Sequence, residues 1–455
     1  MKIIIAGAGR IGLTLTKVLS EEGHDITLID ENPDIIYHAS NEYDVICVVG
    51  NATISETLKE AGAESADILI AATEKDEVNM VCGISAKKLG TKDVIVRVRE
   101  TEYLKESEFL RDALGISFII NPELECAKEI SRILRFPSAA RVEIFSKRSA
   151  ELVEHRVREG GKLDGVQLKD LEHLFRAKVL VGVVKRGQEV FIPNGEFVVK
   201  GGDTLEITGP SNEVRKFFIS AGEYRRPIKD VIIMGGGRIS VYLASLLIDS
   251  GIDVTVIEMD RTQCERFCEI VPKAHVICAD GTSNEVLLEE NIQNVGGFVA
   301  LTGDDGDNIV TSLFAAKSGV EKIVTKVNRD HYSDIIDKSI LESLVTPKNV
   351  IAQQIARYVR AMDNSKESGM ESLYRIADGM AEAVEFKIST DSRCIGTPLK
   401  DLRINKDMII AAIIRGSKAE IPNGNSVIEA GDHVIVITAA GRLKEFDSIV
   451  EEAAG

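Results

Sequence analysis

Short apolar runs alternate with amphipathic stretches along the first third of the chain. Helices are predicted between the runs, for example over Ile11–Glu22 and Glu77–Leu89. The runs are apolar throughout, as strands are when helices cover both faces of a parallel sheet. The pattern predicts a Rossmann-like α/β domain with a doubly wound parallel sheet. Its predicted strands are residues 2–7, 25–30, 45–50, 67–72, 94–99 and 117–122.

The pattern changes after about residue 140. Apolar and polar residues alternate in predicted strands at 142–147, 180–185 and 204–209. Turn residues separate them, as in Pro193–Gly195 and Gly201–Asp203. This segment is predicted to be a small β-rich α+β domain.

The whole arrangement occurs twice. IIIAGAGRIG ends at Gly12 and VIIMGGGRIS ends at Ser240, a shift of 228 residues (240 − 12). FIPNG ends at Gly195 and EIPNG ends at Gly424, a shift of 229 (424 − 195). A shift held over such a distance indicates duplication of a complete unit. The sequence therefore predicts four domains, over residues 1–137, 138–222, 229–362 and 370–455.

Connecting segments can be predicted from the same pattern. Pro122 and Pro347 precede helical stretches at Glu123–Leu134 and Asn349–Ala361, which are expected to bridge the two parts of each copy. The polar residues 363–369 are expected to form a flexible linker. Residues 222–229 are expected to join the two copies.

A glycine-rich segment directly after the first predicted strand is the clearest candidate for a binding site. Gly7-Ala8-Gly9-Arg10-Ile11-Gly12 opens a predicted helix, and Asp30 closes the next predicted strand. In such a turn the first glycine permits the bend and the second lets a pyrophosphate approach the backbone. The free N–H groups of the helix then face the phosphates. Strand, turn, helix and terminal acid together predict a dinucleotide site.

The residues after Asp30 indicate which nucleotide fits. Asp30 can accept hydrogen bonds from ribose hydroxyls. Glu31 and Asn32 follow it, with no arginine to compensate a 2′-phosphate. NAD is therefore favoured over NADP.

Other predicted strand ends should face the same crevice. Asn51, Thr73, Glu74 and Arg97 are the candidates. Arg97 could equally form an ion pair with a nearby carboxylate. Arg10 could reach a phosphate or remain solvated, and the phosphate is favoured.

The second glycine-rich segment departs from the pattern. Ser240 stands where the third glycine is expected, adding a hydroxymethyl group where helix and strand should touch. Thr302–Asp305 adds acid near the expected phosphate. Nucleotide binding by the second copy is left open. Its candidate residues are Gly235, Gly236, Gly237, Arg238, Ile239, Glu258 and Asp280.

Composition narrows the class of protein. The chain has 455 residues, 44% of them hydrophobic, and a net charge of −17. The acidic balance argues against a nucleic-acid partner. No apolar run approaches the roughly 18 residues of a membrane span. The seven cysteines are scattered, so neither a disulfide framework nor a zinc site is predicted.

Catalytic groups are not evident in the sequence. The seven histidines are dispersed, and none falls at a predicted strand end facing the crevice. No nucleophile elbow or Walker lysine is present. The sequence thus favours a nucleotide sensor without catalytic or metal residues. An oxidoreductase with an unrecognised active site, or a soluble redox sensor, are the alternatives.

The layout resembles the RCK (regulator of K⁺ conductance) family. The resemblance rests on GAGRIG, the Asp30 strand end, GNAT at 50–53, the Thr73 loop, and the IPNG and GGD motifs of the β-rich part. Two such units in one chain are similar to the cytosolic subunits of Trk-type potassium uptake systems. The family often has aspartate where Asn51 stands.

The resemblance implies a function. Such proteins bind NAD, NADH, ATP or ADP in the first Rossmann domain and assemble into homo-oligomeric rings. The expected partner is a membrane-embedded Trk-type potassium transporter subunit, which the ring would gate. The expected location is cytoplasmic and peripheral, at the inner face of the cell membrane.

Overall fold

The computed structural model describes most of the chain. The described residues are 1–135, 141–145, 150–223, 228–329, 332, 335–336, 340–341, 343–364, 369–405, 407–416, 418–439, 443 and 445–450. Contacts divide the chain into two compact units. The first unit holds Met1–Ser131 and Lys229–Val359, and the second holds Arg132–Ile228 and Arg360–Gly455.

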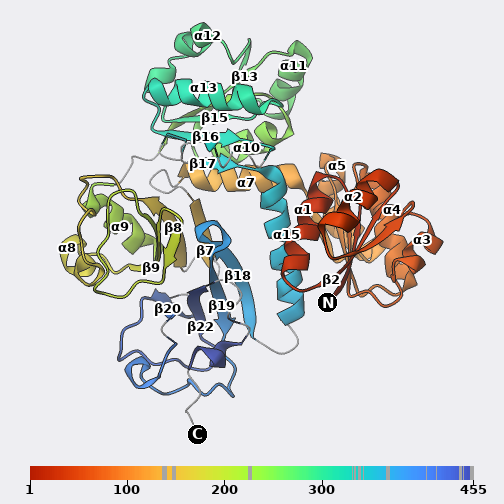
Figure 1. Cartoon of the computed structure of the whole chain (residues 1–455). Helices are drawn as coiled ribbons and strands as arrows, with labels where there is room; N and C mark the ends of the chain where they lie inside the picture. The colour runs from red at the N-terminus through yellow and green to blue at the C-terminus, as the bar shows by residue number, and fades with distance from the viewer. Residues whose placement is uncertain are drawn as a thin grey trace. The chain divides into compact units, whose positions relative to one another are not determined.

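The first unit contains two parallel six-stranded sheets with their connecting helices (Figure 1). The first sheet has the strand order β3-β2-β1-β4-β5-β6, and the second has β14-β13-β12-β15-β16-β17. Each is the doubly wound Rossmann order, which creates a ligand crevice where the order reverses beside the first strand. The predicted fold class is confirmed for both copies.

The elements of the first Rossmann domain follow the predicted strands closely. They are β1 (Lys2–Ala6), α1 (Arg10–Glu21), β2 (Asp25–Asp30), α2 (Pro33–Glu42), β3 (Ile46–Val49), α3 (Ser55–Glu60), β4 (Ile68–Ala71), α4 (Asp76–Leu89), β5 (Asp93–Arg97), α5 (Thr101–Lys105), α6 (Ser107–Leu114), β6 (Phe118–Ile120) and α7 (Pro122–Arg135).

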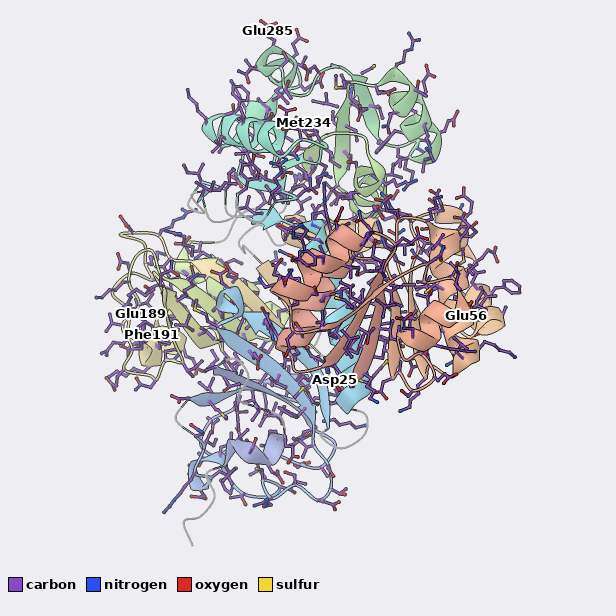
Figure 2. The ribbon with its side chains drawn as sticks, turned by 45° about the vertical axis from the view of Figure 1, so that its right-hand side comes forward. Asp25, Glu56, Glu189, Phe191, Met234 and Glu285 are labelled. Carbon is purple, nitrogen blue, oxygen red and sulfur yellow. The ribbon has the colours of Figure 1, made fainter. Side chains whose placement is uncertain are left out.

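The second Rossmann domain repeats this order. Its elements are β12 (Asp230–Met234), α10 (Arg238–Asp249), β13 (Asp253–Glu258), α11 (Arg261–Ile270), β14 (His275–Cys278), α12 (Asn284–Glu289), β15 (Gly297–Ala300), α13 (Asp305–Lys317), β16 (Lys322–Lys326), β17 (Ser343–Val345) and α15 (Pro347–Asn364). Figure 2 shows Glu56 on α3 and Glu285 on α12, which occupy equivalent exposed positions of the two copies.

The second unit contains two antiparallel five-stranded sheets, with the orders β10-β9-β11-β8-β7 and β18-β19-β22-β20-β21. The first β-rich module consists of β7 (Arg141–Phe145), β8 (Ala150–Arg156), α8 (Leu171–Phe175), β9 (Leu180–Arg186), β10 (Glu189–Phe191), β11 (Thr204–Gly209) and α9 (Ser211–Ala221). The second consists of β18 (Met370–Ile376), β19 (Ala381–Lys387), β20 (Met408–Arg415), β21 (Lys418–Glu420) and β22 (His433–Ala439).

The predicted connections need one correction. Helix α15 continues through Asp363 and Asn364, so the first part of the expected linker is helical. Its residues 365–368 lie outside the described residues, as do residues 224–227 of the segment between the copies. Strands β8 and β18 were not predicted from the sequence.

A buried apolar core fills each domain. In the first Rossmann domain it includes Ile4, Leu69 and Val96 from neighbouring parallel strands. In the second, Ile232, Phe298 and Ile323 occupy comparable strands. These cores fix the strand ends that carry the candidate site.

Candidate nucleotide sites

The three glycines of the first loop meet three different spatial demands. Gly7 has a φ of +103°, a conformation that side chains rarely adopt. A Cβ on Gly12 would lie 1.8 Å from the carbonyl oxygen of Gly7, so the helix and the loop touch there. A Cβ on Gly9 would meet nothing within 4 Å. Gly9 therefore faces open space, where a phosphate can approach.

Among the described residues, no side chain caps the N-terminus of α1. Its N-cap is Gly9, which makes no side-chain cap, and the first turn holds no acidic residue. Helix α2, in contrast, is capped by the Asn32 side chain, which accepts from the amides of Asp34 and Ile35. The first amides of a helix need partners from outside it. Those of α1 are left for an anion such as a pyrophosphate.

Asp30 is tied to the glycine loop through its own carboxylate. Its Oδ2 accepts a hydrogen bond from the amide of Ala8 at 2.7 Å, and its Oδ1 accepts one from Asn32 at 2.9 Å. These bonds fix the carboxylate at the end of β2. Each carboxylate oxygen has a second lone pair. Asp30 can thus also accept from ribose hydroxyls, the role predicted for it.

Asn51 closes a turn after β3. Its Oδ1 accepts from the amide of Thr53 at 2.8 Å and from the Thr53 hydroxyl at 2.6 Å. The structure places the residue at the strand end, as predicted, and shows its carbonyl oxygen directed at the backbone of the turn.

Asn79, which the sequence analysis missed, organises two strand ends. Its Oδ1 accepts from the amide and the hydroxyl of Thr73 at 2.8 and 2.6 Å. Its Nδ2 donates to the carbonyl oxygens of Thr73 and Arg97 at 3.1 and 3.0 Å. Asn79 is fully buried and holds the ends of β4 and β5 together. No short motif marks this role, because the partners lie on different strands.

Arg97 is a half-buried cation at the end of β5. One of its terminal nitrogens donates to the Thr73 carbonyl oxygen at 3.0 Å, whereas its Nε is buried without a partner. Burial, with the nearby charge of Arg99, lowers the pKa of Arg97. The nearby carboxylate of Glu123 is bonded to Arg99 instead, at 2.7 Å. The ion pair considered for Arg97 is therefore not formed with Glu123.

The remaining candidates of the first copy differ in exposure. Ala8 is buried, Ile11 is intermediate, and Arg10 and Glu74 are exposed. The position of Arg10 is compatible with either of its two predicted roles.

The second copy keeps the backbone of the loop. Gly235 has a φ of +100°, and Gly237 is the uncapped N-cap of α10, with φ and ψ close to those of Gly9. Glu258 accepts from the amides of Gly236 at 2.6 Å and Asp260 at 2.9 Å, as Asp30 does in the first copy. Ile239 is partly buried behind the loop.

Ser240 does not distort this loop. Its hydroxyl donates to the carbonyl oxygen of Gly235 at 2.5 Å, and the residue is fully buried. The steric conflict expected from the hydroxymethyl group is thus replaced by a hydrogen bond. The substitution by itself leaves the phosphate-facing geometry in place.

Other differences separate the two copies more clearly. Arg238, the counterpart of Arg10, forms an ion pair with Glu100 at 2.6 Å. Lys326 occupies the end of β16, where the first copy has Arg97, and burial lowers its pKa. Asp304 caps α13 by accepting from the amide of Asp307 at 2.9 Å. One of the two cations of the second copy, Arg238, is therefore already paired with a carboxylate.

Asp280, the counterpart of Asn51, forms the same turn. Its Oδ1 accepts from the amide and hydroxyl of Thr282 at 2.9 and 2.7 Å. These bonds hold the pKa of Asp280 below its usual value. The position adds a negative charge to the second crevice that the first copy does not carry.

Within the described residues, no helix is long and apolar enough to cross a bilayer.

Comparison with known proteins identifies the family of the chain. The TrkA-N domain model matches residues 3–122 and 231–347, and the TrkA-C domain model matches residues 152–218 and 383–450. The chain is 32% identical over 440 residues to the Trk system potassium uptake protein TrkA of Vibrio alginolyticus, covering 96% of this chain and 95% of that protein. It is 31% identical over 450 residues to a TrkA homolog of Archaeoglobus fulgidus, covering 99% and 100%.

Solved structures share the fold. A GsuK channel bound to NAD matches with a TM-score of 0.62 at 18% identity, covering 98% of this chain and 78% of that one. The GsuK RCK domain matches with a TM-score of 0.61 at 18% identity, covering 96% and 92%. Both relatives are named as potassium uptake proteins, which favours the non-enzymatic interpretation over the oxidoreductase alternative. The chain belongs to the TrkA family of Trk system potassium uptake proteins.

Proposed function

We propose that the chain is a nucleotide-binding regulatory subunit that gates a membrane-embedded Trk-type potassium transporter. The relatives named as potassium uptake proteins support the transport role. The observation that carries the nucleotide role is the uncapped N-terminus of α1, open at Gly9 and flanked by the fixed carboxylate of Asp30.

The geometry supports a dinucleotide or an adenine nucleotide. The pyrophosphate would lie against the amides after Gly9, and a ribose would bond to Asp30. Arg97, half-buried at the end of β5, would add a positive charge near the crevice. GsuK structures bound to NAD and to ADP provide precedents of the same fold. Exposed Glu31 beside Asp30 disfavours a 2′-phosphate and hence NADP.

The groups at the crevice support regulation rather than turnover. Those described above are backbone amides, Asp30, Asn51, Thr73 and Arg97, which bind and orient a ligand. A bound nucleotide shifts the equilibrium between two conformations only if it binds them with different affinities. NAD and NADH, or ATP and ADP, would therefore act oppositely if they differ in that preference.

Assembly into a homo-oligomeric ring is part of the proposal. Helix α4 exposes Val81 and Ile84, and α13 exposes Val310 and Leu313 at the positions 229 residues later (310 − 81 and 313 − 84). Apolar side chains exposed on one helix in both copies fit a contact with a second copy of this chain. Such a ring would associate with its transporter partner at the cytoplasmic face of the membrane.

Gly9→Ala tests the nucleotide site without disturbing the fold. The added methyl group meets no protein atom within 4 Å, so the unfolding midpoint should stay near that of the wild type. The methyl group would, however, stand where the pyrophosphate approaches. Calorimetry with NAD, NADH, ATP and ADP should show a loss of affinity of at least tenfold for the ligand that binds the wild type.

Gly237→Ala is the matched control, because a Cβ there also meets nothing within 4 Å. It reports on the second copy alone. Asp30→Ala should weaken binding by about 1–3 kcal/mol through the loss of charged hydrogen bonds. Unchanged affinity in both Gly9→Ala and Asp30→Ala would place the nucleotide elsewhere and contradict the proposal.

A further inference from the structure

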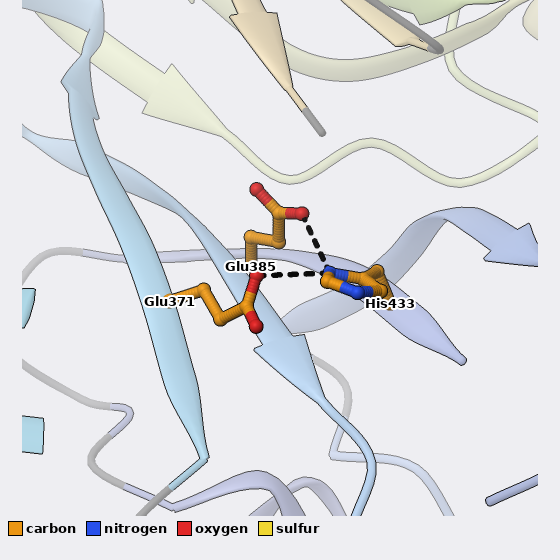
Figure 3. Close-up of side chains that lie close together, drawn as sticks. All are labelled: Glu371, Glu385 and His433. Atoms are coloured by element: carbon orange, nitrogen blue, oxygen red, sulfur yellow. Dashed lines mark hydrogen bonds and ion pairs between the residues drawn. The ribbon is translucent and has the colours of Figure 1, made fainter. Parts of the chain in front are cut away.

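Three side chains of metal-ligand type converge in the second β-rich module (Figure 3). They are Glu371 of β18, Glu385 of β19 and His433 of β22, and one ligand atom from each lies within 4.8 Å of the others. The Nδ1 atom of His433 lies 3.0 Å from Oε2 of Glu371 and 3.1 Å from Oε1 of Glu385. His433 is one of the seven histidines whose spacing in the sequence indicated no site.

A bulge in the sheet brings Glu371 into the group. Met370 pairs with Phe386 and Ser372 pairs with Glu385, so Glu371 is the extra residue between them. Such bulges redirect a side chain from its regular alternation. Lys387 pairs with His433, which makes Glu385 a diagonal neighbour of the histidine on the same face.

The three side chains differ in solvent exposure. The Glu385 side chain is 5% exposed, that of His433 26% and that of Glu371 43%. The hydroxyl of Ser372 donates to Oε2 of Glu385 at 2.8 Å, and Oε1 is the atom directed at His433. A ligating carboxylate oriented by a neighbouring hydrogen bond is typical of metal sites. The exposed Glu371 gives an ion access from solvent.

The distances of 3.0 and 3.1 Å are hydrogen-bond distances, yet two carboxylates share the single Nδ1 atom of His433. One imidazole nitrogen carries a single proton, so its hydrogen bond can be linear to only one of the two carboxylates. A tetrahedral ion holding its ligands at about 2.0–2.2 Å keeps them about 3.3–3.6 Å apart. The separations of 3.0 and 3.1 Å are a few tenths of an ångström shorter, so a bound ion requires the side chains to move slightly apart. A divalent ion would also neutralise the two neighbouring carboxylates.

We infer that Glu371, Glu385 and His433 form a binding site for a divalent transition-metal ion of the zinc class. An imidazole with two carboxylates suits Zn²⁺, whereas Mg²⁺ and Ca²⁺ prefer oxygen ligands alone. Three protein ligands leave a fourth position for water or an external ligand. The inference does not depend on the proposed nucleotide regulation.

The first module provides an internal comparison. Its strand β8 reads AELVEHR where β19 reads AEAVEFK, so Glu154 corresponds to Glu385. Thr204 pairs with Arg156 as His433 pairs with Lys387. The first module thus has threonine at the position of the histidine, and the inferred site belongs to the second copy.

The test uses the full-length chain, freed of metal by a chelator. Zn²⁺ is titrated by calorimetry into the wild type, His433→Thr and Glu371→Gln. His433→Thr makes the change that the first module carries, and Glu371→Gln alters an exposed side chain without touching the core. The expected result is one Zn²⁺ per chain in the wild type and an affinity at least tenfold lower in both variants. Mg²⁺ and Ca²⁺ should bind at least tenfold more weakly than Zn²⁺.

Two controls make the result specific. His275→Gln removes an exposed histidine at the start of β14 and should leave Zn²⁺ binding unchanged. Co²⁺ substitution should show no sulfur-to-metal charge-transfer band, which excludes the thiols of Cys264, Cys268 and Cys278 in the second Rossmann domain as ligands. The inference would be overturned if both variants bound Zn²⁺ as tightly as the wild type, if a thiolate band appeared, or if the wild type did not bind Zn²⁺. In the last case the three side chains make only the contacts seen in the structure.

Discussion

Gly12 and Ser240 occupy the same position of the two loops and satisfy it differently. At Gly12 a Cβ would lie 1.8 Å from the Gly7 carbonyl oxygen. At Ser240 the hydroxyl bonds to the equivalent carbonyl of Gly235. The close contact between loop and helix requires glycine in the first copy, whereas in the second copy a hydrogen bond from serine accommodates it.

Gly12→Ala should therefore destabilise the first Rossmann domain. A methyl group forced against a backbone carbonyl costs about 1–3 kcal/mol through local displacement. Ser240→Ala should cost about 1 kcal/mol, because it leaves the Gly235 carbonyl without its hydroxyl donor. Urea unfolding of the full-length chain measures both. A Gly12→Ala protein as stable as the wild type would show that the loop and helix do not touch there.

Glu151 is a buried carboxyl group whose ionisation opposes folding. Its Oε1 accepts from the Ser211 hydroxyl at 2.6 Å, while its Oε2 is buried without a partner. Burial raises the pKa of Glu151, and the Ser211 bond only partly offsets this effect. A raised folded-state pKa means that the stability contributed by the protonated group is full below the unfolded pKa and is lost as pH rises.

Glu151→Gln should remove this pH dependence. Above about pH 4.3, the ordinary glutamate pKa, the wild type should lose stability relative to the variant by at most about 1.4 kcal/mol per pH unit. The loss should end once pH passes the raised pKa of the folded protein. Thermal unfolding of both proteins across pH 4–8 provides the comparison, and parallel curves would contradict the assignment.

Residues with local roles could be predicted from the sequence, and residues with distant partners could not. Gly7 and Gly9 act within one turn, and their spacing between a predicted strand and a predicted helix, with Asp30 after the next strand, indicated the loop. His433 meets Glu371 and Glu385 only because three strands pair in a particular register. The cluster therefore had no signal in the spacing of the sequence.

Elements of the parallel sheets were predicted well because their strands are apolar on both faces. Strands β8 and β18 were missed for the opposite reason. β8 reads AELVEHR and carries Glu151 and Glu154 among its apolar residues. β18 contains Glu371 and Arg375. A strand that contains charged residues does not form a continuous apolar run, so the search for such runs did not predict it.

Asn79 links the ends of β4 and β5. The sequence predicted both strands but indicated no contact between their ends. The four hydrogen bonds of Asn79 join the end of β4 to the end of β5, and Asn308 makes the same four contacts in the second copy. Asn79→Ala should lower the free energy of unfolding by about 2–4 kcal/mol, since net hydrogen bonds contribute about 1 kcal/mol each. It should also weaken nucleotide binding by releasing Thr73 and Arg97.

Asn79→Asp separates the two roles of this side chain. It keeps the acceptor for the amide and hydroxyl of Thr73 and removes the donor to the carbonyl oxygens of Thr73 and Arg97. Chemical unfolding and calorimetry on both variants would show which strand end matters for the ligand. Wild-type stability in Asn79→Ala would mean that the network does not hold the strand ends.

At the scale of the molecule, the two β-rich modules share a buried core. Phe145, Leu152 and Val183 of the first module belong to the same apolar cluster as Ile376 and Ile437 of the second. Gly182 and Ile437 are 255 residues apart (437 − 182), yet a Cβ on Gly182 would lie 2.2 Å from Cδ1 of Ile437. No periodicity in the sequence indicates such a contact, although the repeat itself predicted the four domains.

A double-mutant cycle across this contact tests the shared core. Gly182→Ala should cost about 1–3 kcal/mol by overpacking. Ile437→Val, which removes the opposing methyl group, should cost about 0.5–1.5 kcal/mol. The double variant should be more stable than the sum of the two predicts, by about 0.5–3 kcal/mol. Additive effects in urea unfolding would show that the modules do not meet here.

Potassium flux through the reconstituted complex tests the central claim most directly. The chain is combined with its transporter partner in liposomes, and ⁸⁶Rb⁺ uptake is measured with and without the nucleotide that calorimetry identifies. The account predicts that the nucleotide changes uptake with the wild type and with Gly237→Ala, and that Gly9→Ala, although folded, abolishes the response. A full response with Gly9→Ala, or no response with the wild type, would contradict regulation through the first glycine loop.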